Sequence, residues 1–381
     1  MMISRFMSSL VVTLVVLFTA SLACAAGTIK IGALFSVTGP PAFLGEPERN
    51  TAKMMVDSIN KAGGIKGQKL ELVVYDTAGD ATKAVQMATK LIKDDKVVAI
   101  IGPSTTGETM AVIPVVERAK IPLISCAAGS KITEPVKHYV FKTAQNDGLA
   151  VAKIYEYLQH ARLHKVAILT VSDGFGASGR EQLKALVGKN GIQIVADDTY
   201  GPKDTDMTSQ LTRIRASQAQ ALIVWGTNPG PAVIAKNAKQ LGLKLPLFMS
   251  HGVSAKKFIA LAGDASEGIK LPSGKVIVAD VLPKNDPQKS ALLAYVRDYQ
   301  RHYNVEGDHF GGHAWDAVML LKTALEHGSA SPEGIRAGLE KIRNFHGIGG
   351  TFNFSAHDHA GLTKDAFVMV DIKNKDWLIA K

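Results

Sequence analysis

Residues 28–75 read TIKIGALFSVTGPPAFLGEPERNTAKMMVDSINKAGGIKGQKLELVVY, in which two β-rich segments flank one segment of helical period. Runs of β-branched and other apolar residues predict strands over 28–34 and 69–75. Between them, residues 47–62 repeat apolar side chains at the spacing of one helix face, and these are Ala52, Met55, Val56 and Ile59. Strand, helix and strand in this order predict a parallel βαβ unit.

The same unit repeats along the chain. In the first series we expect helices at 80–94 and 107–119, the latter interrupted by Pro114, and strands at 97–101 and 122–125. A second series begins near Asp147, with helices expected at 147–159, 175–190, 206–216 and 229–241 and strands at 165–171, 193–197, 221–225 and 247–249. Two such series predict an α/β fold of two doubly wound lobes, with the ligand site at the carboxyl ends of the strands.

The remaining residues, 276–381, do not predict a third domain. They offer strands near 276–279, 350–354, 366–372 and 377–380, and helices at 288–303, 312–327 and 331–341. These strands are too few, and in the wrong order, to close a sheet of their own. We therefore expect this segment to return and complete both lobes, so that several chain segments cross between them as a hinge.

Composition restricts the class of protein. The chain has 381 residues, 46% of them hydrophobic and 20% charged, which suffices for a sizeable core in roughly two domains. Lys and Arg exceed Asp and Glu by 44 to 34, for a net charge of +10, but the basic residues are scattered without interleaved aromatics. We therefore expect no nucleic-acid partner. Two cysteines exclude a disulfide scaffold and a four-cysteine zinc site.

Residues 1–25 predict a secretory signal peptide, because Arg5 precedes the apolar run 10–20 and small residues follow it. That run is about half of the ~20 residues that span a bilayer, so a retained anchor helix is disfavoured. Acylation of Cys24 would make a lipoprotein instead, but a leucine lies one place too close to that cysteine. We expect cleavage at the end of this segment and a soluble protein outside the cytoplasm with Cys126 as its only cysteine.

Motifs for catalysis are missing from the sequence. It contains no Walker A, G-x-S-x-G or H-E-x-x-H pattern, and residues 263–268 have Walker spacing but precede Ile269, where a lysine is required. Cys126 is interpreted as a packing residue. His309 and His313 are four apart, but the glycines between them are expected to break the helix, so we interpret both as solvated loop histidines. The sequence predicts no enzyme activity, no cofactor and no metal.

Two polar turns follow neighbouring strands and predict a binding site. Ser104, Thr105 and Thr106 precede a helix start, where free N–H groups and hydroxyls would bind a carboxylate. The alternative is plain N-capping, for which serine and threonine are preferred anyway. The turn at 125–130 follows the next strand, and its small residues would expose backbone groups to a ligand. Two adjacent polar strand ends favour a ligand site.

Several segments carry a resemblance to one family. They are IGALFSVTGP at 31–40, INKAGGIKG at 59–67, YD at 75–76, the turn at 102–109, DGFG at 173–176 and GL at 242–243. With these segments, nearly all of residues 28–381 resembles the periplasmic solute-binding proteins of ABC transporters, of the leucine/isoleucine/valine-binding type.

The resemblance implies a type I periplasmic binding protein, in which two Rossmann-like lobes close on a ligand like a Venus flytrap. It implies three hinge crossings, expected near Gln145, Asp280 and Asp365. Lobe 1 would then comprise 26–145 plus 281–365, and lobe 2 would comprise 146–280 plus 366–381. The implied partners are a small-molecule carboxylate and the membrane permease of an ABC importer, and we expect a monomer. A sensor of the same fold that feeds a receptor is the alternative.

The resemblance also implies ligand contacts. Thr106 would take the ligand's carboxylate, and Phe175 would close on the ligand from lobe 2. The other implied contacts are Phe43, Ser104, Thr105, Ala127, Ala128, Gly129, Thr227, His251 and Phe310.

His251 stands where the amino-acid binders of this family place an acidic residue that grips the ligand's ammonium. Because histidine cannot supply a permanent negative charge at pH 7, we expect a carboxylate without an α-amino group, whose binding strengthens as His251 protonates toward pH 6. An aromatic wall of Phe43, Phe175, Trp225 and Phe310 would favour aromatic or other organic acids over branched-chain amino acids. Alternatively, His251 packs at the lobe edge, and backbone carbonyls or another acid hold an ammonium.

Overall fold

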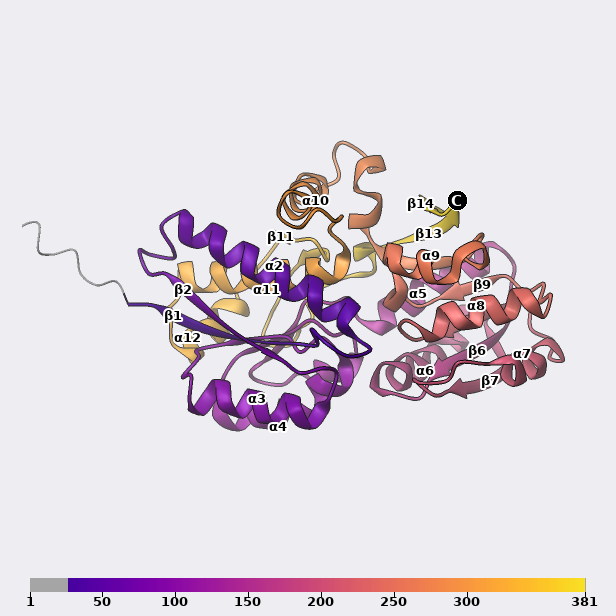
Figure 1. The fold of residues 1–381 in the computed structure, drawn as a ribbon, viewed down its shortest axis with the longest axis horizontal. Helices are drawn as coiled ribbons and strands as arrows, with labels where there is room; N and C mark the ends of the chain where they lie inside the picture. Colours follow the sequence, from indigo (N-terminus) through magenta and orange to yellow (C-terminus); the bar gives the residue numbers. More distant parts are fainter. Residues whose placement is uncertain (1–26, 381) are drawn as a thin grey trace, which may run out of the picture.

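A computed structural model describes residues 27–380 as two lobes, each built around its own sheet (Figure 1). The first sheet has five strands in the order β2-β1-β3-β4-β5, and all of its pairs are parallel. Its elements are β1 (Ile29–Phe35), α2 (Ala42–Lys61), β2 (Leu70–Asp76), α3 (Ala81–Lys93), β3 (Ile100–Ile101), α4 (Thr106–Ala119), β4 (Leu123–Ser125) and β5 (Val140–Lys142).

The second sheet has seven strands in the order β14-β13-β10-β9-β8-β6-β7. Strands β6 to β10 pair in parallel, whereas β13 pairs antiparallel with both β10 and β14. The elements of this part are α5 (Asp147–His160), β6 (Lys165–Val171), α6 (Gly174–Leu186), β7 (Gln193–Tyr200), α7 (Thr208–Arg215), β8 (Ala221–Trp225), α8 (Gly230–Gln240), β9 (Leu247–Met249), α9 (Lys256–Ala262) and β10 (Lys270–Gly274).

Both lobes repeat one topology. The first five strands of each lobe, numbered in chain order, lie in the spatial order 2-1-3-4-5. This is a doubly wound order, and it confirms the predicted fold class. In such a sheet the strand order reverses between the first and third strands, and ligands bind outside the carboxyl ends at that point.

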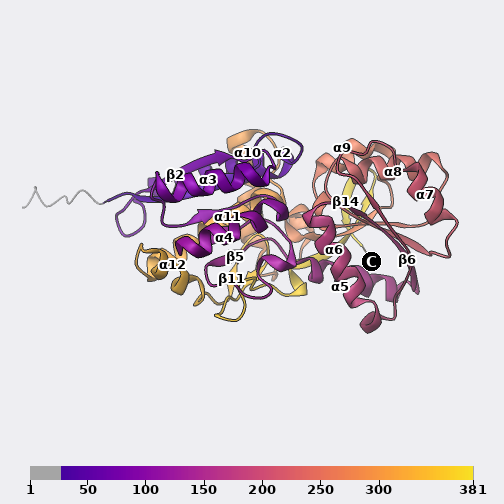
Figure 2. The same ribbon diagram turned by 90° about the horizontal axis from the view of Figure 1, so that it is seen from below.

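The C-terminal part returns to both lobes, as predicted. Its elements are α10 (Lys289–Tyr303), α11 (His309–His327), α12 (Pro332–Leu339), β11 (Phe345–His346), β12 (Thr351–Phe352), β13 (Phe367–Lys373) and β14 (Asp376–Ile379). Helix α11 packs along α2 and α12 packs on α11, so both belong to the first lobe, whereas β13 and β14 extend the second sheet (Figures 1 and 2).

The chain passes between the lobes in three connections, which follow β5, β10 and β12. The predicted crossings near Gln145, Asp280 and Asp365 fall within these connections. The lobe boundaries themselves remain predictions.

Each sheet is covered by apolar side chains on both faces, which explains why the strands lack a polar alternation. On one face of the first sheet, Phe35 packs in a buried cluster with Leu321 of α11. On the other face, Leu34 packs with Leu91 of α3 and Val112 of α4. Two further clusters cover the second sheet in the same way.

Several element predictions were wrong. The strand expected at 276–279 is part of a 3-10 helix (Lys275–Val281), and the real strand is β10, which contains Pro272. A proline disfavours a strand, so the sequence pattern around Pro272 did not predict β10. Strand β5 and helix α9 were not predicted, and Pro114 does not interrupt α4.

Helix α11 begins at His309, not at 312, so the glycines inside it do not break it. Both glycines are required by close packing. A Cβ on Gly311 would lie 2.2 Å from Tyr295 Oη, and one on Gly312 would lie 2.4 Å from Ile348 Cγ2.

None of the helices within residues 27–380 is long and apolar enough to cross a membrane. The predicted signal peptide, with Cys24, lies outside the described residues.

Candidate functional site

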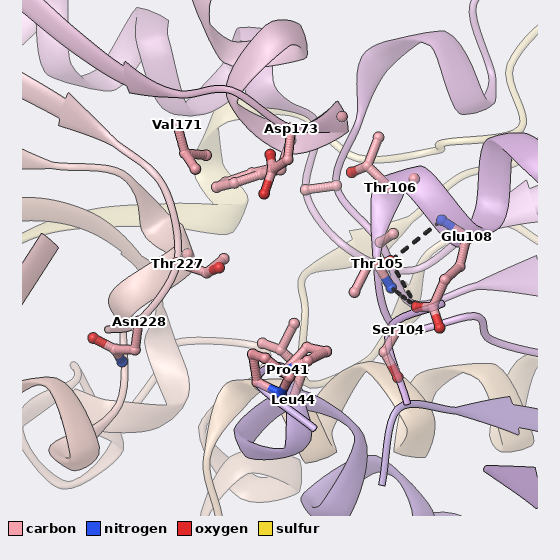
Figure 3. A pocket seen from close by; sticks show the side chains of 18 of the residues that line it. Pro41, Leu44, Ser104, Thr105, Thr106, Glu108, Val171, Asp173, Thr227 and Asn228 are labelled. Atoms are coloured by element: carbon pink, nitrogen blue, oxygen red, sulfur yellow. Dashed lines mark hydrogen bonds between the residues drawn. The ribbon is translucent and has the colours of Figure 1, made fainter. Parts of the chain in front are cut away.

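A cavity of about 340 Å³ lies between the lobes at the carboxyl ends of both sheets (Figure 3). This volume falls within the range of about 300–1,000 Å³ that is usual for small-molecule sites. Its walls include the segments after β1 and β3 in the first lobe and after β6 and β8 in the second. These are the first and third strands of each sheet, so the cavity lies where the strand order reverses in both lobes.

The cavity brings together most of the predicted contact residues. Those that line it are Ser104, Thr105, Thr106, Ala127, Ala128, Phe175, Thr227, His251 and Phe310. Gly129 does not line it. Phe43 lines a neighbouring hollow and meets Phe310 edge to face, with ring centroids 5.6 Å apart. Trp225 is fully buried behind Phe175 and is not part of the wall.

The turn before α4 uses two of its three hydroxyls internally. Thr105 is the N-cap of α4 and forms a capping box with Glu108, because its Oγ1 accepts from the Glu108 backbone N–H at 3.3 Å and donates to Glu108 Oε2 at 2.6 Å. Ser104 Oγ donates to Glu48. For these two residues the capping and packing interpretation holds.

Thr106 is different, because its hydroxyl proton has no acceptor among the described residues. Its Oγ1 accepts from Gly129 N–H at 3.3 Å, which leaves the O–H free to donate into the cavity. Thr106 and Gly107 are the first two residues of α4, where backbone N–H groups have no partner within a helix. Together these donors can hold a carboxylate at the positive end of the helix dipole.

The second turn is held from behind by a buried lysine. Lys142, on β5, donates from Nζ to the carbonyls of Ala128 at 2.7 Å and Gly129 at 3.3 Å. Burial lowers the pKa of Lys142 to about 8. Its side chain thus fixes the turn whose backbone faces the cavity.

The start of α6 forms the opposite wall. Asp173 caps this helix by accepting from Gly176 N–H at 2.8 Å, and burial raises the pKa of its carboxyl. Gly174 lies directly against the start of α4, since a Cβ on it would be 3.1 Å from Gly107 N. The N-termini of α4 and α6 therefore meet at the cavity, and both dipoles favour an anion there.

His251 lies at the back of this wall, in an aromatic surround. Its ring centroid is 5.4 Å from that of Phe175, 5.7 Å from Trp225 and 5.3 Å from Phe367. Both ring nitrogens are buried without a hydrogen-bond partner, and Nε2 is 3.7 Å from Asp147 Oδ1.

Burial, followed by nearby positive groups, lowers the pKa of His251 to about 3. The imidazole is therefore neutral at pH 6, and the expectation that acidification to that pH would charge it is wrong. A neutral imidazole offers one donor and one acceptor to a ligand.

His309 and His313 are not solvated loop residues. Both are buried on α11, both line the cavity, and burial lowers the pKa of each. Each has an Nδ1 without a hydrogen-bond partner. Within residues 27–380 no group of three or more His, Cys, Asp or Glu side chains could hold a metal ion.

Among the polar residues of the wall that were missed from the sequence are Glu48, Tyr200 and Asn228. Tyr200 Oη and the Asn228 amide are buried without a hydrogen-bond partner. Tyr200 ends β7, and Asn228 follows β8. Both lie at or just after the carboxyl end of a predicted strand, and this position could have predicted them as wall residues. Glu48 lies inside α2 and carried no such signal.

Two doubly wound lobes that share one cavity at their facing strand ends define a bilobal solute-binding protein of the type I periplasmic fold. The sequence comparisons assign the family within this class. Residues 28–376 match the periplasmic binding protein family, and the chain belongs to that family.

Relatives and solved structures cover most of the chain. The leucine-, isoleucine-, valine-, threonine- and alanine-binding protein of Pseudomonas aeruginosa is 28% identical over 84% of each chain. An extracellular ligand-binding receptor from Rhodopseudomonas palustris HaA2 has a TM-score of 0.87 at 26% identity, over 92% of this chain and 99% of that one. A substrate-binding protein of a branched-chain amino acid transporter from Streptococcus pneumoniae, solved with isoleucine, has a TM-score of 0.81 at 26% identity, over 93% and 99%.

Proposed function

We propose that this protein captures a small carboxylate ligand in the interlobe cavity, in the periplasm, and delivers it to the membrane permease of an ABC importer. The anchor for the carboxylate is the start of α4, with the free hydroxyl of Thr106 and the N–H groups beside it. The relatives named as binding proteins for amino acids, all of which carry a carboxylate, support this assignment.

The ligand is an organic acid without an α-ammonium group, and an aromatic acid fits the wall best. The observation that carries this is His251, a buried and neutral imidazole at the far side of the cavity. A neutral ring cannot balance an ammonium, whereas it can pair with a hydroxyl or a carbonyl. The unpartnered Tyr200 Oη and Asn228 amide offer the same kind of neutral partner. Phe175 and Phe310 supply aromatic surface.

Matched ligand pairs test this proposal. Hydrocinnamate and phenylalanine differ only in the α-ammonium, as do isocaproate and leucine. Each is added to the protein, and the midpoint of thermal unfolding is measured. We expect the acid of each pair to raise the midpoint, since a ligand at 100 times its Kd stabilises the native state by about 2.7 kcal/mol. The amino acids should have little effect.

The variant His251→Glu is the control, because it places an acid at this position. This variant should no longer bind the acids, because the new carboxylate repels theirs, and it should bind the amino acids instead. Tight binding of leucine or phenylalanine to the unmodified protein would show that the ligand class is wrong, although a solute-binding role would stand.

A further inference from the structure

Glu48 is a buried carboxyl that contacts the turn before the carboxylate anchor. It is 1% exposed, lies on α2 and lines the cavity. Ser104 Oγ, which itself accepts from the Ser36 N–H at 3.0 Å, donates to Glu48 Oε2. This is the one hydrogen bond of the Glu48 side chain within residues 27–380, so its second oxygen is left for the cavity.

The neighbouring Glu108 has a contrasting environment. Ser36 Oγ lies 2.8 and 3.0 Å from its two oxygens, Thr105 Oγ1 donates at 2.6 Å, and Thr105 N–H donates at 3.2 Å. The partners of Glu108 are all donors, and this is the hydrogen-bond pattern of an ionised carboxylate. The anchor therefore already holds one negative charge before a ligand arrives.

A second charge on Glu48 would be unfavourable. Burial raises the pKa of Glu48 well above its ordinary value, the hydrogen bond from Ser104 opposes this, and the charges of Glu108 and Asp308 raise it further. No cation counts among the groups that shift it. Glu48 and Glu108 both contact the turn before α4, and a ligand carboxylate would lie nearby. Without a counter-charge, these three groups cannot all be ionised.

The other groups that face this corner supply no such counter-charge. Burial raises the pKa of the Cys126 thiol, and the charge of Glu48 would raise it further, so the thiol stays neutral. His309 and His313, on α11, line the same cavity and are kept neutral by burial.

We propose that Glu48 takes part in binding as a neutral carboxylic acid, whose hydroxyl donates a hydrogen bond to the ligand's carboxylate beside Thr106. This inference rests on the proposed function, because a ligand carboxylate at the start of α4 is what needs a further donor. A carboxylic acid kept neutral in an apolar site is a known way to provide such a donor. Glu48 then determines specificity for anions, whereas an ionised Glu48 would select a ligand with an ammonium.

The protonation of Glu48 can be measured without any ligand. The infrared spectrum of a protonated carboxyl has a carbonyl band well separated from the carboxylate bands. The difference between the unmodified protein and Glu48→Gln at pH 7 should show the loss of one protonated carboxyl. Glu46→Gln, on the same helix but largely exposed, is the matched control and should show the loss of a carboxylate. Loss of a carboxylate in Glu48→Gln would overturn the proposal.

Should Glu48→Gln fail to fold, Glu48→Asp provides the same information. It should shift the protonated-carboxyl band and not remove it. The absence of any change in that band would overturn the proposal equally.

Binding is tested with benzoate as the carboxylate probe and leucine as the amino-acid probe. Glu48→Gln should bind benzoate within a few-fold of the unmodified protein, because the glutamine amide also donates. Glu48→Leu, which has no donor, should bind it at least about tenfold more weakly. Benzoate binding that becomes tenfold tighter in Glu48→Gln would reveal a repelling charge and contradict the proposal. The proposal would also be contradicted if leucine bound to the unmodified protein and Glu48→Gln abolished that binding.

The two arms separate this inference from the proposed function. If neither benzoate nor the acids of the matched pairs bind, the proposed ligand class fails, while the infrared difference still decides whether Glu48 is protonated. If benzoate binds and the infrared difference shows that Glu48→Gln loses a carboxylate, the proposed function is retained and the proposed role of Glu48 is rejected.

Discussion

Thr105 and Thr106 are neighbours with different hydrogen-bond partners, and this difference gives a test at the scale of single residues. The hydroxyl of Thr105 is engaged with Glu108 in the cap of α4, whereas the proton of Thr106 is free. Thr106→Ala should weaken binding of the acid that the matched pairs identify by about 1–3 kcal/mol, the range for a hydrogen bond to a charged group. Calorimetric titration measures it.

Thr105→Ala is the matched control for that substitution. It should lose about 1 kcal/mol of unfolding free energy, because the cap is removed, and change the affinity less than Thr106→Ala does. If Thr106→Ala lost stability and kept its affinity, Thr106 would be a capping residue only.

Most of the residues that the resemblance placed at the cavity follow strands, and strand ends are visible in a sequence; Phe310, on α11, is an exception. Thr106 and Thr227 come shortly after runs of buried apolar residues, so topology alone brings them to one edge. Glu48 and His309 are on helices, and their burial depends on how α2 packs against α11. The contact between α2 and α11 joins segments far apart in the chain, so no local sequence pattern predicts it.

At the scale of elements, the contact between the starts of α4 and α6 predicts the effect of adding volume there. A Cβ on Gly174 would lie 3.1 Å from Gly107 N and 3.2 Å from Gly107 Cα, and both are backbone atoms of the other lobe. Gly174→Val should weaken ligand binding by about 1–3 kcal/mol, the usual cost of overpacking, and Gly174→Ala by less. The ligand-free protein should unfold at an unchanged or higher temperature, because both lobes keep their own cores.

Gly188→Ala is the control for this pair of variants, since a Cβ there would meet nothing within 4 Å. Its affinity should match that of the unmodified protein. If Gly174→Val bound the acid normally, the two helix starts would not need to approach each other in the bound state.

Element types were predictable where hydrophobic period and length agreed, as in β6, β8 and α10, because local preferences suffice there. The errors occurred where tertiary packing overrides a local preference. Helix α11 tolerates its two glycines because Tyr295 and Ile348 fill the space beside them. Strand β10 tolerates Pro272 although a proline cannot donate a ladder hydrogen bond.

The whole molecule consists of two lobes, each built around its own sheet, joined by three connections and in contact around the cavity. Across the cavity rim, Ser130 N–H donates to Ser178 Oγ at 3.1 Å, and Gly174 lies against Gly107. These few contacts are small beside the lobe cores, so an open arrangement costs little. A ligand that touches both walls then shifts the population toward the closed arrangement by the difference between its affinities for the two.

We therefore expect the radius of gyration, measured by small-angle scattering, to decrease when the acid identified by the matched pairs saturates the protein. Gly174→Val should compact less at saturation, because its side chain holds the two helix starts apart. Thr106→Ala should behave differently: it removes a contact without obstructing the lobes, so its saturated form should compact fully at a higher acid concentration. An unchanged radius in the saturated unmodified protein would contradict lobe closure and would leave the cavity as a preformed site.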